Sequence, residues 1–68
     1  MKSYHETATA EKEELDRRAT QLSEFIGSSP DFAELDADAQ GLLKVQNDLM
    51  WQMSEVLGAL IKVLTPRP

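Results

Sequence analysis

The chain has 68 residues, no cysteine, one histidine and a formal net charge of −5. This length fits one small domain, and the residue counts exclude disulfides, a thiol nucleophile and a metal centre built from several histidines. The acidic balance opposes nonspecific binding to nucleic acid or to anionic membranes, which depends on clustered lysine and arginine.

A chain of this size buries little surface on its own. Scaling relations give about 4,300 Å² of folded surface against roughly 11,000 Å² unfolded, so a lone monomer would bury only about 60% of its surface. Ordering each residue costs ~1.5 kcal/mol, and small chains usually offset this cost with disulfides, metals or oligomerisation. Since disulfides are excluded and a single histidine disfavours a metal site, we expect a homo-oligomer.

The sequence predicts a cytoplasmic protein. The N-terminal residues lack the apolar stretch of a signal peptide. No run of about 18 uncharged apolar residues is present to cross a membrane. We therefore expect no membrane contact.

The first predicted element is a helix over residues 4–26. Its apolar side chains recur at helical spacing, at Tyr4, Ala8, Leu15, Ala19, Leu22 and Ile26. They share an arc of about 60°, which makes a narrow apolar stripe on an otherwise charged helix. Gly27 is expected to end this helix in a left-handed C-cap.

A connection over residues 27–36 is predicted to contain one short helical turn at Pro30–Leu35. Ser29 is a suitable N-cap, and Pro30 suits the first position of a helix. Phe32 and Leu35 of this turn would plug the end of an antiparallel hairpin. We expect one domain over residues 1–68.

The second long helix is predicted over residues 37–64, with Asp36 as its N-cap. Its apolar residues cover an arc of roughly 160°, which the stripe of the first helix cannot cover. We expect the remainder to mediate self-association. The fold class is therefore all-α, a two-helix antiparallel hairpin that assembles into a homo-oligomeric bundle. The residues assigned to the oligomer interface are Leu49, Met53, Val56, Leu57, Leu60, Ile61 and Leu64.

No group of side chains indicates catalysis. His5-Glu6 begins like a zinc protease motif but lacks the second histidine four residues on. The four acidic residues between positions 11 and 16 lie beside Lys12, Arg17 and Arg18 and are expected to form intrahelical ion pairs on a solvated face. The serines have no histidine placed to activate them. We expect no enzymatic activity, no metal and no cofactor.

Trp51 breaks the amphipathic pattern of the second helix. It lies outside the apolar arc and away from the expected contact with the first helix. Exposed tryptophan is frequent in contact surfaces because its ring supplies a large area and a donor nitrogen. Packing on the first helix or on a neighbouring subunit, contact with a partner or ligand, and simple exposure remain alternatives. Its neighbours on the wheel are Lys44, Asn47, Glu55, Gly58 and Lys62.

Gln46 is the converse case, a polar residue inside the apolar arc. If it is buried, its amide needs hydrogen-bond partners, which a symmetry-related copy could provide. A ligand contact is the alternative interpretation.

Several spaced motifs extend over about residues 11–61. They are Glu11-Lys12-x-Glu14-Leu15-Asp16-x-Arg18, Leu22-x-x-Phe25-Ile26, Phe32-x-x-Leu35, Gln40-x-Leu42-Leu43-x-x-Gln46 and Val56-Leu57-Gly58-x-x-Ile61. This pattern resembles a group of short phage and prophage proteins. The sequence departs from the group at Met53, where tyrosine is usual, and at Leu60, where arginine is usual. The resemblance implies a phage origin, and hence the cytosol of an infected host, but no particular activity.

Small phage proteins that are not part of the virion often antagonise host defence. This context, and not any particular residue, suggests an anti-defence function. Our main hypothesis is direct inhibition of a host defence protein, in the manner of anti-CRISPR proteins. The partner-binding residues would be Trp51, Lys44, Asn47, Glu55, Gly58, Asp31, Glu34, Asp36 and Asp38.

One alternative is an oligomeric sponge that sequesters a nucleotide immune signal at its subunit interfaces. Its ligand-binding residues would be Arg17, Arg18, Gln46 and Lys62. A structural or assembly accessory of the phage is a further alternative.

Overall fold

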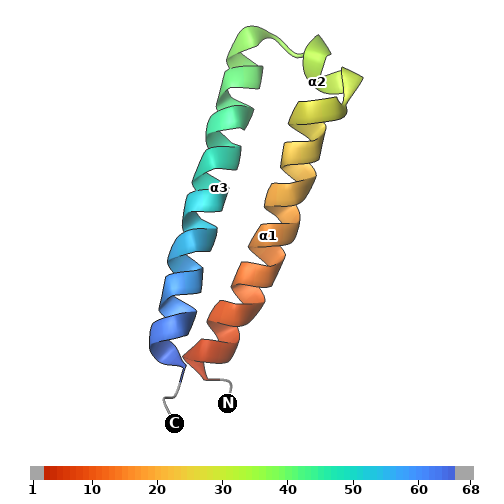
Figure 1. The fold of residues 1–68 in the computed structure, drawn as a ribbon. Coiled ribbons are helices and arrows are strands. Elements are labelled where there is room, and N and C mark those ends of the chain that lie inside the picture. Colours follow the sequence, from red (N-terminus) through yellow and green to blue (C-terminus); the bar gives the residue numbers. More distant parts are fainter. Residues whose placement is uncertain (1–2, 66–68) are drawn as a thin grey trace.

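Two long antiparallel helices form a hairpin, with a short helix between them (Figure 1). This architecture comes from a computed structural model that describes residues 3–65. The elements are α1 (Tyr4–Ser28), α2 (Pro30–Glu34) and α3 (Ala37–Leu64). The predicted all-α hairpin is confirmed for the described residues. The second long helix has the predicted bounds, whereas α1 continues two residues beyond its predicted end.

Each helix begins at a side chain that caps its N-terminus. The Ser3 hydroxyl accepts a hydrogen bond from the backbone N–H of Glu6 at 3.2 Å. Ser29 and Asp36 cap α2 and α3 in the same way, and Asp36 Oδ1 lies 2.7 Å from the backbone nitrogen of Ala39. These caps are favoured because the first N–H groups of a helix have no partner within it. The predicted caps Ser29 and Asp36 are confirmed.

The end of α1 differs from the prediction. Gly27 is not in the left-handed region, since no glycine among the described residues has a positive φ. The helix instead continues to Ser28 and ends at Ser29, whose extended backbone allows its N–H to donate to the carbonyl of Phe25. Because Ser29 ends α1 and also caps α2, the chain needs no left-handed residue here.

The short helix α2 closes one end of the hairpin. Phe32 is buried and meets Phe25 edge to face, with ring centroids 5.9 Å apart. Lys44 Nζ lies 5.9 Å from the centre of the Phe32 ring. Gln40 Nε2 donates to the carbonyl of Leu35 at 2.8 Å. Phe32 plugs the hairpin as predicted, but the Leu35 side chain is exposed.

The hairpin has a small core. Its buried residues are Ala8, Ala19, Phe32, Ser54 and Leu57, and none of the large side chains described is fully buried. The molecule is a rod of 51 × 19 × 16 Å with 5323 Å² of accessible surface. A compact monomer of the same mass would expose about 4,300 Å². The hairpin therefore exposes about 1,000 Å² more than a compact monomer.

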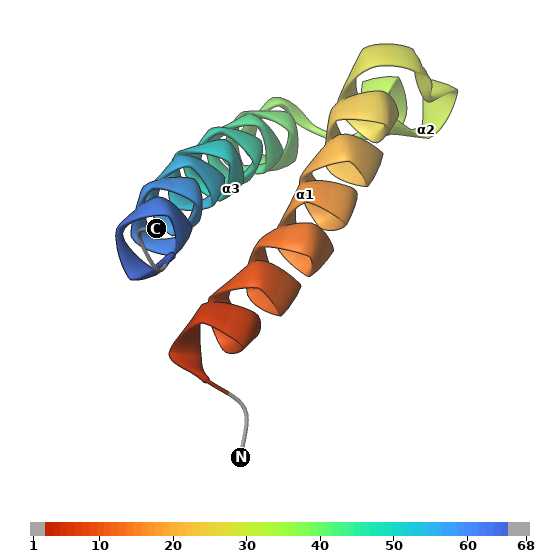
Figure 2. The ribbon, with the colours of Figure 1, turned by 60° about the horizontal axis from the view of Figure 1, so that its bottom comes forward.

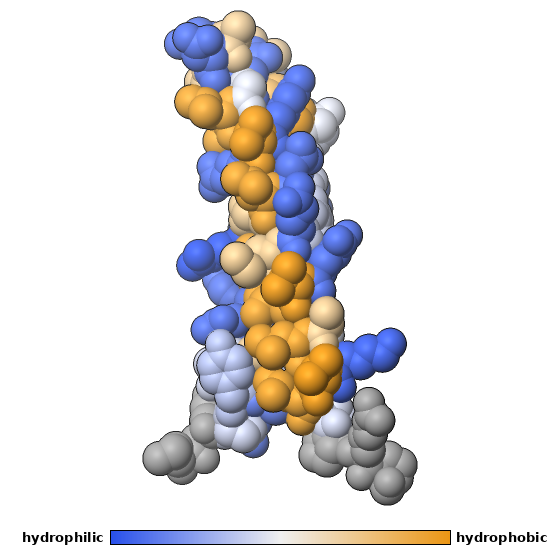
Figure 3. Space-filling model, turned by 90° about the vertical axis from the view of Figure 1, so that its left-hand side faces the viewer, coloured by the Kyte–Doolittle hydropathy of each residue, from blue (hydrophilic) through white to orange (hydrophobic). Residues whose placement is uncertain are grey.

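Much of the exposed apolar surface lies on α3. Seen from the side of α3, hydrophobic side chains run along the length of the rod (Figure 3). Figure 2 shows α1 and α3 as a single pair, so no other described element covers this side of α3. The prediction that α1 cannot cover the whole apolar face is confirmed. We call this surface the outer stripe; it consists of Leu42, Val45, Leu49, Met53, Val56, Leu60 and Val63.

None of the helices within residues 3–65 is long and apolar enough to cross a membrane.

Candidate functional site

Polar side chains link α1 and α3 across one edge of the hairpin. Lys12 Nζ donates to Ser54 Oγ at 2.7 Å and pairs with Asp16 Oδ2 at 2.9 Å. The Ser54 hydroxyl in turn donates to Asp16 Oδ1. The hydrogen bonds from Ser54 and Lys12 lower the pKa of Asp16. Gly58 lies beside Lys12, because a Cβ at this position would be 3.4 Å from Lys12 Cε, at the limit of ordinary van der Waals contact.

This polar cluster was not predicted, because Lys12 and Asp16 were expected to pair only within their own helix. Ser54 is 4% exposed and would otherwise be an unsatisfied hydroxyl between two helices. Two features of the sequence could have indicated the cluster. They are the small residues Ser54 and Gly58, one turn apart on α3, and the i, i+4 pair Lys12 and Asp16 on α1. The cluster fixes the register of the hairpin.

A second set of polar contacts involves Trp51. Its Nε1 donates to Ser23 Oγ at 3.2 Å, and Ser23 Oγ donates to Asn47 Oδ1 at 2.9 Å. Asn47 Nδ2 donates to the carbonyl of Ala19 at 3.0 Å. The wheel position that placed Trp51 away from α1 is therefore misleading, and the alternative of packing on the first helix is the one that these contacts support. On the helical wheel of α3, Trp51 lies at the edge of the surface that contacts α1, and its long indole extends sideways to Ser23. The residue remains 38% exposed.

Substitutions at Trp51 are expected to affect stability. Trp51→Phe removes one donor and should cost about 1 kcal/mol. Trp51→Ala also removes partly buried ring area and should cost about 2 kcal/mol, less than a fully buried aromatic. Urea unfolding followed by circular dichroism measures both, with Gln21→Ala on the exposed surface of α1 as control. A Trp51→Ala protein as stable as this control would contradict the observed packing.

The opposite edge of the hairpin is a shallow apolar groove of about 560 Å³. Leu15 lines it from α1, and α3 contributes Leu42, Val45, Gln46, Leu49, Met50 and Met53. Gln46 is the one polar side chain among these lining residues, and it is exposed. The groove thus combines an apolar wall with a single amide that can both donate and accept hydrogen bonds.

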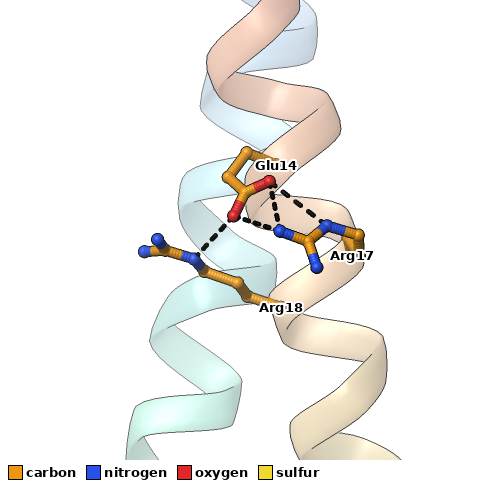
Figure 4. Close-up of polar contacts among 3 residues, drawn as sticks. All are labelled: Glu14, Arg17 and Arg18. Atoms are coloured by element: carbon orange, nitrogen blue, oxygen red, sulfur yellow. Dashed lines mark hydrogen bonds and ion pairs between the residues drawn. The ribbon is translucent and has the colours of Figure 1, made fainter.

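An ion cluster on α1 adjoins this groove. Leu15 also lines a neighbouring hollow of about 370 Å³ together with Ala10, Glu11, Glu14 and Arg18. Glu14 Oε2 accepts from Arg17 Nη2 at 2.6 Å, and Glu14 Oε1 accepts from Arg18 Nε at 3.0 Å (Figure 4). The hydrogen bonds from Arg17, with those from Arg18, hold the pKa of Glu14 below its usual value.

The cluster carries one more positive than negative charge. Among residues 3–65, Arg18 uses only its Nε in hydrogen bonds, so its two terminal nitrogens have no described partner. An exposed ion pair contributes little stability, because water screens both charges. The two guanidiniums can therefore exchange Glu14 for another anion at small cost.

The other predicted site residues do not form one surface. Asn47 and Gly58 are engaged in contacts between the helices, and Lys44 lies over Phe32. Lys62 is near the end of α3, about 15 Å along the helix axis from the level of Arg18. Glu55 is exposed on α3. The acidic residues Asp31, Glu34, Asp36 and Asp38 are exposed around α2 and the first turn of α3.

The predicted oligomer-interface residues divide into two groups. Leu57 is 9% exposed and packs inside the hairpin, so it is not available to a second copy. Leu60 and Ile61 are half-buried. Leu49, Met53, Val56 and Leu64 are exposed.

The fold and the groove define a small helical hairpin with one open apolar edge and an adjoining hollow that Arg18 lines. A comparison with protein families matches residues 1–62 to the Sequestin family, so the chain belongs to that family. No curated protein and no solved structure matches the chain. The phage group indicated by the motifs remains a prediction.

Proposed function

We propose that this protein sequesters a small anionic ligand of the nucleotide class in the groove beside Arg18. The observation that carries the proposal is the position of Arg18, which lines a hollow that shares Leu15 with the open apolar groove. The name of the family, Sequestin, describes the same kind of activity. A sequestering protein needs only a complementary surface, which fits a chain in which we expect no catalysis.

The chemistry of the groove suits the two halves of a nucleotide. Leu15 and Met50 offer apolar surface against which a base can lie. The Gln46 amide can hydrogen-bond to the edge of that base. The Arg18 guanidinium can hold a phosphate through paired N–H groups, with the phosphate replacing Glu14.

Direct inhibition of a host defence protein draws less support from the structure. Two of the residues proposed to contact such a partner, Trp51 and Asn47, are engaged in hydrogen bonds between the helices. The acidic residues around α2 remain exposed, but nothing in their arrangement specifies a partner.

Calorimetric titration with a panel of mononucleotides and of linear and cyclic dinucleotides tests the sequestering function. We expect at least one member to bind at micromolar concentration. Arg18→Ala should weaken that binding by about tenfold or more, because a charge-assisted hydrogen bond is lost. Glu14→Gln should strengthen it, because the competing carboxylate is removed.

Lys62→Ala is the matched control, since it removes an exposed positive charge far from the groove. Its affinity should equal that of the wild type. A panel with no binder, or a binder that is indifferent to both Arg18→Ala and Glu14→Gln, would contradict the proposed function.

A further inference from the structure

We propose that the outer stripe of α3 pairs antiparallel with the same stripe of a second copy. The stripe recurs at three- and four-residue intervals, which keeps its members on one side of the helix. Most of its members are strongly exposed, including Leu42 at 71%, Val56 at 62% and Val63 at 82%. A sustained apolar seam of this kind needs a second helix as its partner.

The surface area argues for a second copy as that partner. The hairpin exposes about 1,000 Å² more than a compact monomer of its mass. Each partner in a stable protein interface loses about 800 Å². Burial of the outer stripe in a symmetric dimer would therefore remove most of the excess, without any other protein.

The order of side chains along the stripe indicates the antiparallel direction. Apart from Met53, its members stand three, four, seven, four and three residues apart, which reads the same in both directions. The centre of this symmetry falls between Gln52 and Met53. Antiparallel pairing about that centre places Leu42 opposite Val63, Val45 opposite Leu60 and Leu49 opposite Val56.

Each antiparallel layer then contains one leucine and one valine. Well-packed cores place larger side chains opposite smaller ones, so that successive layers fill the same space. Parallel pairing would instead place leucine against leucine in some layers and valine against valine in others. The antiparallel arrangement fills the seam evenly, whereas the parallel arrangement alternates between crowded and thin layers.

This pairing also determines where the two ion clusters lie. Asp16 meets Ser54 and Ala19 meets Asn47, so the centre of the stripe is level with Arg17 and Arg18 of α1. The outer stripe is on the side of α3 that faces away from α1, so the two copies of α1 lie on the outer flanks of the paired α3 helices (Figure 3). The result is an assembly of four helices with the two α3 helices at its centre.

The groove of the proposed function would then border the dimer interface. Four of the residues that line the groove, Leu42, Val45, Leu49 and Met53, also belong to the outer stripe, so the second copy would lie against this wall of the groove. This consequence rests on the proposed function, whereas the pairing of α3 does not.

Single cysteines test the pairing directly, because the natural chain has none. The variants are Met53→Cys, Leu42→Cys and Val63→Cys, at side chains that are exposed in the hairpin. Under mild oxidation without ligand, Met53→Cys should form a disulfide-linked dimer, because it lies beside the axis. Leu42→Cys alone should not, since its two copies would be about 31 Å apart. An equimolar mixture of Leu42→Cys and Val63→Cys should cross-link between the two variants.

Thr20→Cys, at an exposed position of α1 away from the outer stripe, is the control for disulfides formed by random collision. It should remain monomeric on a non-reducing gel. Efficient cross-linking of Leu42→Cys with itself would overturn the antiparallel direction. Cross-linking no stronger at Met53→Cys than at Thr20→Cys would overturn the pairing itself. Because no nucleotide is present, these outcomes are independent of the calorimetric titration.

Discussion

Replacing Leu49 with glutamate should raise the dimer dissociation constant by about a hundredfold or more. Leu49 is 58% exposed in the hairpin, so the carboxylate meets water in the separated chain. In the antiparallel dimer it would face Val56 of the second copy, and symmetry places two such carboxylates in one apolar seam. Burying a charge without a partner is strongly unfavourable, and the variant should therefore dissociate.

Sedimentation velocity at a series of concentrations measures this change, and Thr20→Glu provides the matched control. The control introduces the same charge on the exposed face of α1. We expect wild-type association for Thr20→Glu and a single chain for Leu49→Glu. Equal association of both variants would show that the outer stripe is not the interface.

Leu57→Ala should destabilise the hairpin by about 2–4 kcal/mol, because it removes a large buried side chain and leaves a cavity. Leu57 is the largest buried aliphatic residue described in a core that otherwise holds two alanines, Phe32 and Ser54. Small domains have only a few kcal/mol of stability, so this loss should leave a substantial unfolded fraction.

Thermal unfolding followed by far-UV circular dichroism measures the effect, and Glu55→Ala is the control at an exposed position of α3. We expect a much lower midpoint for Leu57→Ala and a nearly unchanged one for Glu55→Ala. Similar midpoints for the two variants would contradict the assignment of Leu57 to the core.

The helices and their starts could be predicted from the sequence because the responsible signals are local. Apolar spacing identifies α1 and α3, and Ser29 and Asp36 cap the N–H groups only a few residues away. The end of α1 was mispredicted for a local reason as well. Glycine permits a left-handed cap, but Ser29 ends the helix with extended backbone, so Gly27 remains helical.

The contacts between helices could not be predicted in the same way. A helical wheel gives the direction of each Cβ but not the reach of a long side chain. The Trp51 indole and the Lys12 ammonium both extend sideways to polar groups on the other helix. Similarly, the single wide arc on α3 contains two faces. Leu57 faces α1, whereas Val56 remains exposed. The way in which α1 packs on α3 decides this division.

The mass of the wild-type protein in solution tests the central claim most directly. Light scattering on the purified chain at micromolar concentration, without ligand, should give twice the chain mass of 7.6 kDa. This result is expected because the outer stripe is buried only in the dimer. A fully helical protein with the mass of one chain at the same concentration would contradict the account.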